Sequence, residues 1–147
     1  MKKSQTAHIV VTVDVIIVYG DCALFIRRGK NPYQGLWAIP GGKLNANDTT
    51  LEAATLREVH EETGVFLQAG ELEQVHTFGN IERDPRGRYI NVVYTALLND
   101  RPQRPQARAG DDARAVEWIP LHMLPVLAFD HMQIMEYVFG SRCRFVF

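Results

Sequence analysis

The residues with the clearest capacity for chemistry form the run Arg57-Glu58-Val59-His60-Glu61-Glu62-Thr63-Gly64. On a helix, positions i, i+3 and i+4 share one face, so Glu58, Glu61 and Glu62 point in the same direction. Hard divalent cations such as Mg²⁺ take carboxylate oxygens, and substrate phosphates commonly complete their coordination. Most charge runs, however, are solvated helix faces. The helix alone therefore leaves two interpretations, a metal site and an acidic surface.

The loop before this helix favours the metal site. Pro40-Gly41-Gly42 lets the backbone approach a ligand without an intervening Cβ atom. Arg57 lies four residues before Glu61 and can pair with it, but one arginine cannot neutralise three glutamates. A glycine turn that leads into an unneutralised acidic helix is poorly suited to solvation alone.

The elements that must position these residues follow from periodicity. Ile9–Tyr19 is apolar on both period-two faces, which predicts a strand covered on both sides. A turn at Gly20-Asp21 leads into a second hairpin arm, Ala23–Arg27. The remaining predictions are a glycine-rich loop at residues 29–42, strands at 72–78, 89–98 and 115–119, an exposed loop at 101–110 and a helix at 130–139 capped by Asp130. Successive strands with two separate helices predict an α+β fold with a mixed sheet.

The acidic run sits on the strongest helix signal in the chain, residues 50–63. Either Thr49 or Thr50 suits the N-cap, since Thr49 and Glu52 have the spacing of a capping box. Gly64 is placed to end the helix.

Length and composition restrict the class of protein. The 147 residues suit one domain, residues 1–147, and the net charge of −1 gives no basic surface for nucleic acid. No segment reaches transmembrane length, so no membrane partner is expected. Two cysteines are too few for a disulfide framework, which predicts reduced thiols and a cytoplasmic location.

The acidic run also resembles the signature box of Nudix hydrolases, G-x5-E-x7-R-E-U-x-E-E-x-G-U, where U is aliphatic. From Arg57 to Val65 every specified position matches. The first half departs: counting from Gly42 puts Asp48 at the first glutamate, and one extra residue then precedes Arg57. The box therefore carries a one-residue insertion and lacks its first glutamate. We expect Asp48 to serve as a cap at the helix entrance, without a chemical role.

Other segments are similar to bacterial ADP-ribose pyrophosphatases of this family. They are the loop at residues 31–42, Arg83-Asp84-Pro85-Arg86-Gly87-Arg88 and Leu127-Ala128-Phe129-Asp130-His131. The resemblance implies an α/β/α sandwich with a mixed β-sheet. It also implies Mg²⁺-dependent, or Mn²⁺-dependent, hydrolysis of ADP-ribose or a related nucleoside diphosphate sugar to a nucleoside monophosphate and a sugar phosphate. A homodimer is plausible from the same likeness, with an interface at the apolar segment Arg142–Phe147.

The resemblance also implies site roles. The expected metal ligands are Glu58, Glu61, Glu62 and the carbonyl of Gly42, with Arg57 orienting Glu61. Asp112, together with Asp111, is a candidate general base on a late loop, although aspartate is equally common in plain turns. Candidate substrate contacts, each with a solvated or core interpretation beside it, are Arg27, Arg28, Tyr33, Trp37, Arg83, Arg86, Phe129 and His131.

Two other functions stay open at this point. One is a house-cleaning hydrolase of non-standard nucleoside triphosphates. The other is a nucleotide-sensing regulator with a non-catalytic Nudix-like domain. Such regulators usually lose box carboxylates and append a DNA-binding domain. Because this chain keeps the three late glutamates and has few residues after its last helix, we expect an enzyme with a small-molecule nucleotide substrate and no nucleic-acid partner.

Overall fold

The computed structural model describes residues 4–110 and 112–147. Its strands are β1 Ile9–Tyr19, β2 Cys22–Arg28, β3 Trp37–Ala38, β4 Gly41–Lys43, β5 Glu73–Phe78, β6 Arg88–Leu97 and β7 Ala113–Pro120. The helices are α1 Leu51–Thr63 and α2 His131–Phe139, with three short 3₁₀ turns at Ala69–Glu71, Leu121–Met123 and Gly140–Arg142. Every predicted helix and strand is present, with ends that shift by one or two residues.

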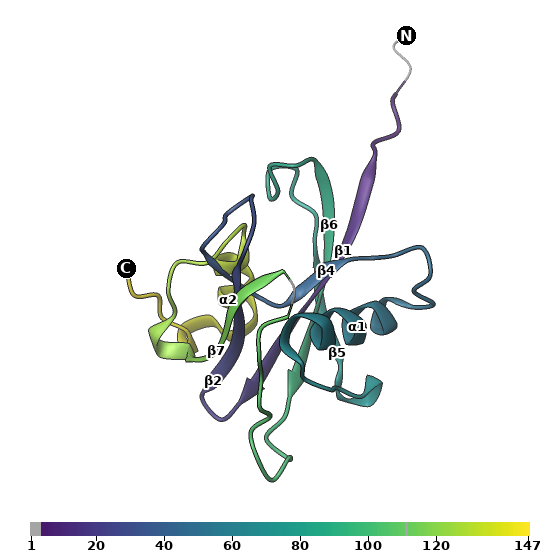
Figure 1. Cartoon of the computed structure of the whole chain (residues 1–147). Helices are drawn as coiled ribbons and strands as arrows, with labels where there is room; N and C mark the ends of the chain where they lie inside the picture. Colours follow the sequence, from purple (N-terminus) through teal and green to yellow (C-terminus); the bar gives the residue numbers. More distant parts are fainter. Residues whose placement is uncertain (1–3, 111) are drawn as a thin grey trace.

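All seven strands belong to one mixed sheet. Its main path runs β3-β2-β1-β6-β5, β4 adds to β1, and β7 adds to β2. The pairing of β1 with β6 is parallel and extends from Ile9↔Arg88 to Val18↔Leu97, whereas the other pairings are antiparallel. α1 and α2 lie on opposite sides of β1 (Figure 1). The predicted α/β/α sandwich with a mixed sheet is therefore confirmed.

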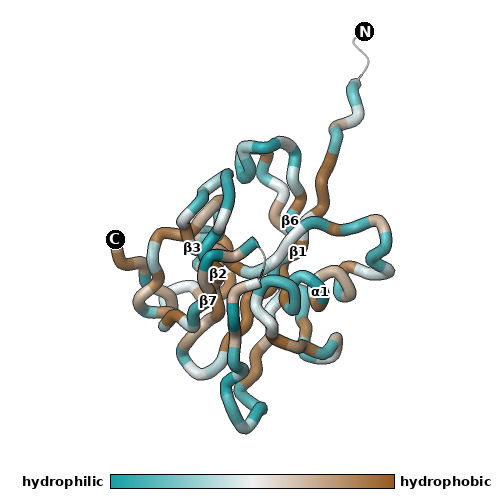
Figure 2. The backbone as a smooth tube through the Cα atoms, in the orientation of Figure 1, coloured by the Kyte–Doolittle hydropathy of each residue, from teal (hydrophilic) through white to brown (hydrophobic). Residues whose placement is uncertain are grey.

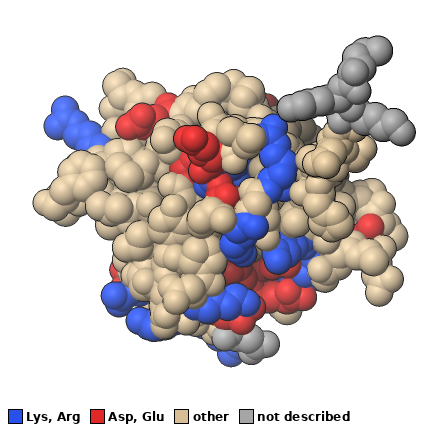
Figure 3. All heavy atoms as spheres, turned by 90° about the horizontal axis from the view of Figure 1, so that it is seen from above, with Lys and Arg blue, Asp and Glu red and all other residues tan. Residues whose placement is uncertain are grey.

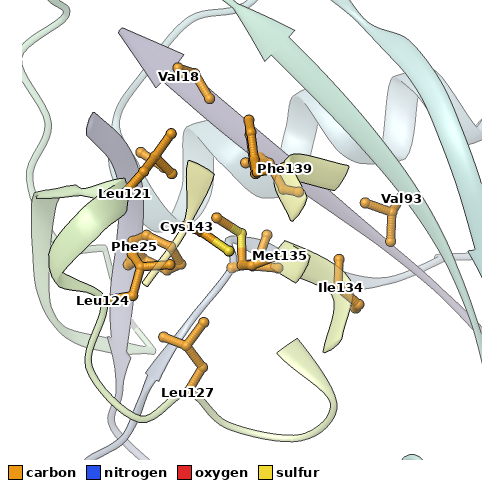
Figure 4. Close-up of a cluster of buried hydrophobic side chains, with 13 residues drawn as sticks. Val18, Phe25, Val93, Leu121, Leu124, Leu127, Ile134, Met135, Phe139 and Cys143 are labelled. Carbon is orange, nitrogen blue, oxygen red and sulfur yellow. The ribbon is translucent and has the colours of Figure 1, made fainter. Parts of the chain in front are cut away.

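The central strand β1 supplies side chains to a hydrophobic core on each face. Ile16 and Val18 pack with Ile134 and Met135 of α2 in one core, as the close-up in Figure 4 illustrates for Val18 and the α2 residues. Val13, Val15 and Ile17 pack with Ala54 and Val59 of α1 in the other. Segments of hydrophobic residues accordingly run through the middle of the molecule, and segments of hydrophilic residues lie mostly in the outer loops (Figure 2). Coverage of β1 on both sides, as its sequence predicted, is confirmed.

The two helix starts differ in how they are capped. Thr50 is the N-cap of α1, since its side chain accepts a hydrogen bond from the Ala53 amide, and Gly64 ends the helix at φ 73°. Asp130 occupies the N-cap position of α2 but makes no side-chain capping bond. Its carboxylate instead accepts two hydrogen bonds from Arg83. The predicted N-cap position of Asp130 is therefore confirmed, but its side chain does not cap the helix, because the carboxylate binds the Arg83 guanidinium instead.

The strands β3 and β4 fall inside the predicted glycine-rich loop. Two and three residues carry too little periodicity to predict a strand. They become strands because they pair along β2 and β1. Neither helix in the described part of the chain has the length and apolar character needed to cross a bilayer.

Candidate active site

A cavity of about 360 Å³ opens where β1 and β2 separate. The two strands pair only beside their hairpin, at Val18↔Ala23 and Tyr19↔Cys22. Farther along, β4 pairs with β1 and β3 pairs with β2, so the segment from β3 to β4 fills the gap. The cavity is lined from both sides of this gap, by residues of β1 and β2, the β3–β4 segment, α1, the loop before β6 and the start of α2.

One wall of the cavity consists of Glu58, Glu61 and Glu62 of α1, which we call the acidic wall. Helical spacing brings the three side chains to one face, as predicted, while Val59 turns into the core. Glu62 accepts a hydrogen bond from the Gly41 amide at 2.8 Å. A Cβ atom on Gly42 would overlap the Glu58 carboxylate, so this close approach of strand and helix requires glycine.

Arg57 holds two members of the acidic wall. Its Nη1 donates to Glu58 at 2.7 Å and to Glu61 at 3.2 Å, and the orienting role of Arg57 toward Glu61 stays a prediction. Its Nε and Nη2 donate to the two carboxylate oxygens of Asp48, both at 2.9 Å. The predicted capping role of Asp48 is therefore wrong. Asp48 is the fixed charge partner of Arg57, whose guanidinium lowers the Asp48 pKa to about 2.

The carboxylates of the acidic wall are crowded and partly buried, and both effects disfavour their ionisation. Burial raises the pKa of Glu62 to about 8, with further increases from the nearby carboxylates of Glu58 and Asp14, against the lowering effect of the Gly41 amide. Burial also raises the pKa of Glu58, although Arg57 opposes this shift. A buried carboxylate that resists ionisation gains strongly from a nearby cation.

The donors on this wall fit a hard divalent cation in type, since all are oxygens. In the described part of the chain, no three Asp, Glu, His or Cys side chains already converge on one metal position. Glu58 and Glu61 are instead turned toward Arg57. Metal binding at this wall therefore requires rotation of these side chains away from Arg57.

The opposite side of the cavity holds Arg28, Arg83 and Arg86, which we call the basic wall. Arg83 is buried and makes a two-bond ion pair with Asp130, with contacts of 2.6 and 2.9 Å. Arg86 makes a similar pair with Asp84, at 2.8 and 3.0 Å. Figure 3 shows acidic and basic side chains gathered next to one another on one face of the molecule.

Arg28 differs from the other members of the basic wall. Its Nε donates to the Pro32 carbonyl at 2.7 Å, and the described residues offer it no ion pair. Burial, and then the positive charge of Arg86, lower the pKa of Arg28. Of the three arginines on this wall, Arg28 is therefore the one that a bound anion would stabilise most.

Phe129 lies between two arginines at the edge of the cavity. The Arg28 and Arg86 guanidiniums lie 4.8 and 5.4 Å from its ring centre. Tyr33 packs against the same ring but does not line the cavity. Two other predicted substrate contacts also lie outside it: Arg27 donates to the Gly35 carbonyl, and Trp37 packs against the core beneath α2.

Asp112 lines the cavity at its exposed rim, where its carboxylate lies 3.5 Å from the Lys30 ammonium. Its backbone carbonyl accepts a hydrogen bond from the Gly29 amide, which ties the late loop to the end of β2. Asp111, the other candidate base, lies outside the described residues. Whether Asp112 acts as a base remains a prediction.

Sequence reasoning missed a group of buried polar side chains that lines part of the cavity. Asp14 and Asn91 lie side by side on β1 and β6, and His131, predicted as a substrate contact, has both ring nitrogens engaged with Asp14 and the Ile39 amide. One signal was available, because Thr12 and Asp14 are polar residues two apart in an otherwise apolar strand. Polar residues at that spacing share one face, and a buried strand tolerates them only with partners.

The chain is similar to known proteins along most of its length. Residues 8–139 match the family described as NUDIX domain. An ADP-ribose pyrophosphatase from Methanocaldococcus jannaschii is 38% identical over 88% of this chain and 72% of its own length. The ADPR responsive transcriptional repressor NtrR of Acinetobacter baylyi is 34% identical over 95% of this chain, which spans 56% of the repressor.

A solved structure shares the fold. It is a bifunctional NMN adenylyltransferase/ADP ribose pyrophosphatase from Francisella tularensis, complexed with AMP and a Mn ion. It superimposes with a TM-score of 0.79 at 28% identity, over 95% of this chain and 43% of that protein. The family match spans residues 8–139 and includes the acidic helix. The chain therefore belongs to the Nudix hydrolase family.

Proposed function

We propose that this protein hydrolyses the diphosphate of ADP-ribose, or of a related nucleoside diphosphate sugar, in a reaction that depends on Mg²⁺ or Mn²⁺. The single observation that carries the proposal is the acidic wall, a crowded set of three carboxylates that lines the same cavity as three arginines. A diphosphate with bound metal supplies the positive charge that the first group needs and the negative charge that the second needs. The similarity to an ADP-ribose pyrophosphatase supports the substrate class.

Glu58, Glu61 and Glu62 would hold the metal, with the Gly42 carbonyl beside them. A divalent ion in this position supplies charge neutralisation for the diphosphate and makes a bound water more acidic. Before a metal binds, Arg57 would hold the carboxylates of Glu58 and Glu61 through hydrogen bonds, and Asp48 holds the Arg57 guanidinium in place.

The reaction forms a bond between a water oxygen and one phosphorus and breaks the bond from that phosphorus to the bridging oxygen. For ADP-ribose the products are AMP and a sugar phosphate. Arg28 and Arg86 would bind the phosphates, because guanidinium forks match phosphate oxygens. Phe129 would pack against an adjacent ring of the substrate. Asp112 is a candidate acceptor for the water proton, provided that Lys30 releases it.

A nucleotide-sensing role is the second candidate, and the similarity to the A. baylyi repressor favours it. It predicts tight binding of ADP-ribose without turnover.

The absence of a nucleic-acid partner, the homodimer and the cytoplasmic location remain predictions. At the C-terminus, Phe145 packs against the core while Val146 and Phe147 are exposed, and light scattering of the chain with and without residues 146–147 would test a dimer there.

The decisive experiment is a panel of ADP-ribose, GDP-mannose, UDP-glucose and an oxidised nucleoside triphosphate, each with Mg²⁺ and with Mn²⁺. Phosphate release after coupling to a phosphatase reports kcat/KM, the proper measure of specificity. We expect a nucleoside diphosphate sugar to be cleaved best. Preference for the triphosphate by about tenfold or more would replace this assignment with the house-cleaning hydrolase, and binding without turnover would favour the sensor.

A further inference from the structure

A set of hydrogen-bonded buried side chains, which the proposed reaction does not use, lines the same cavity as the acidic wall. Asp14 of β1 is 7% exposed. Its Oδ2 accepts a hydrogen bond from Asn91 Nδ2 at 2.7 Å and lies 3.2 Å from His131 Nε2. Thr12 Oγ1 donates to Asn91 Oδ1 at 2.9 Å and so fixes the orientation of that amide. The group joins β1, β6 and α2.

The partners of His131 determine its tautomer. The Ile39 amide donates to His131 Nδ1 at 3.0 Å, so Nδ1 carries the lone pair. The proton must then lie on Nε2, where it points at the Asp14 carboxylate. Because His131 is buried and both nitrogens are engaged, it has no free donor or acceptor for substrate.

This group reaches the acidic wall through two residues of the β3–β4 segment. Asp14 pairs in register with Gly41, and a Cβ atom at Gly41 would overlap Asp14 Oδ1. The Gly41 amide in turn donates to Glu62 Oε1 at 2.8 Å. The segment Ile39–Gly41 is therefore held from α2 by His131 and bonded to α1 through Glu62, so it links the two sides of the sheet.

We propose that Asp14 and His131 are positioning residues that fix the Ile39–Gly41 segment and thereby place the Glu62 carboxylate for metal binding. The proposal rests on the proposed function in one respect, since it takes Glu62 as a metal ligand. Outer partners of metal ligands commonly govern affinity because they fix ligand orientation. Here that partner is a backbone amide, and its own position is set by the buried histidine.

The direct test is the variant Asp14→Asn, which keeps the shape of the side chain. Asn91 Nδ2 and His131 Nε2 both contact Asp14 Oδ2, so the amide oxygen of the variant can still accept from both donors. It carries no negative charge, however, and both hydrogen bonds become weaker. We expect Mn²⁺ affinity and kcat each to fall by about tenfold to a hundredfold. The KM for ADP-ribose should change by less than about threefold, because the phosphate-binding arginines are untouched. Amide hydrogen exchange at Gly41, followed by NMR, should become faster.

His131 supplies a second variant series. His131→Gln keeps one acceptor and one donor and should retain more Mn²⁺ affinity than His131→Ala. In the wild type, ¹⁵N NMR should show the ring proton on Nε2, and a proton on Nδ1 would overturn the proposal. Met135→Ala is the matched control, since it creates a cavity in the same helix α2 away from the site. It should lower stability while leaving Mn²⁺ affinity within about twofold of wild type.

A purely structural role gives a different result. If Asp14→Asn lowers only the melting temperature, and Mn²⁺ affinity and Gly41 exchange match the wild type, the positioning role is wrong. Failure of the proposed function is distinguishable, because it shows as a wild type that hydrolyses none of the panel. In that case the Mn²⁺ titration and the Gly41 exchange rate still decide between positioning and structure.

Discussion

The acidic wall and the basic wall line the same cavity but differ in how their charged side chains are paired. On the basic wall, Arg83 and Arg86 each have a carboxylate of their own, Asp130 and Asp84. On the acidic wall, Arg57 alone pairs with Glu58 and Glu61 and also with Asp48, while Glu62 has no ion pair among the described residues. Burial raises the pKa of Glu62 on one wall, whereas the hydrogen bonds that Arg86 donates to the Asp84 carboxylate raise the pKa of Arg86 on the other.

This difference shows which wall has its charges paired in the absence of a ligand. A paired arginine gains little from an added phosphate unless it releases its partner, and a buried pair is costly to open. A crowded, buried carboxylate without an ion pair of its own, such as Glu62, is stabilised in its charged form by a nearby cation. Electrostatics therefore predicts that metal binds first, at the acidic wall, and that Arg28 is the strongest phosphate contact on the basic wall because it has no ion pair among the described residues.

The largest expected effect comes from removing charge on the acidic wall. Glu61→Gln and Glu62→Gln should each lower kcat by about a hundredfold or more, because each removes a charge where the metal must sit. Steady-state hydrolysis of ADP-ribose measures this. Glu52→Gln, on the exposed first turn of α1, is the control and should keep the wild-type rate. Near wild-type rates in both site variants would remove the metal role from this wall.

On the basic wall, removal of a charged side chain should lower the stability of the fold. Arg83→Met leaves Asp130 without its partner, and we expect the free energy of unfolding to fall by about 2 kcal/mol, less than for a fully buried pair because Asp130 is partly exposed. Urea unfolding measures this value. The exposed Arg114→Met should stay within about 0.5 kcal/mol of wild type. An unchanged stability of Arg83→Met would show that the basic wall is not held by its own ion pairs.

Arg28 should behave as the exception on its wall. Arg28→Lys keeps the charge but loses the planar fork, so the KM for ADP-ribose should rise by about tenfold with little change in stability. The neighbouring Arg27→Lys lies outside the cavity and is the matched control. Equal KM values for the two variants would contradict the assignment of Arg28 to phosphate.

The smallest effect should be a pH dependence of the metal-free protein. The Glu62 pKa is raised from 4.5 to about 8 in the folded state, so between these values the folded form holds a proton that the unfolded form has released. Stability should therefore be full below the lower pKa and fall as pH rises toward the upper one. Melting curves in a chelator should show this decline in the wild type and a flatter profile in Glu62→Gln. Parallel profiles would show that Glu62 is not the group that holds this proton in the folded state.

Much of this arrangement could be predicted from the sequence. The acidic face follows from helical spacing, and the double coverage of β1 follows from apolar residues on both of its faces. What escaped prediction depends on contacts between distant segments. The ion pair of Arg83 with Asp130 spans 47 residues, and that of Arg57 with Asp48 replaces a local cap. Neither partner choice leaves a periodic signal, because long side chains select among several nearby charges only after the backbone has folded.

The parallel pairing of β1 with β6 also has a consequence for synthesis of the chain. Residues that face each other across it, such as Thr12 and Asn91, are 79 positions apart. On the ribosome β1 emerges first, and only the hairpin with β2 can form before α1 and β6 follow. Both apolar faces of β1 are exposed during that interval, and distant parallel pairings form slowly. Emergence of β6 completes the core beneath α1, but the other core and the cavity need α2 as well, so the nascent chain should depend on chaperones until α2 has emerged.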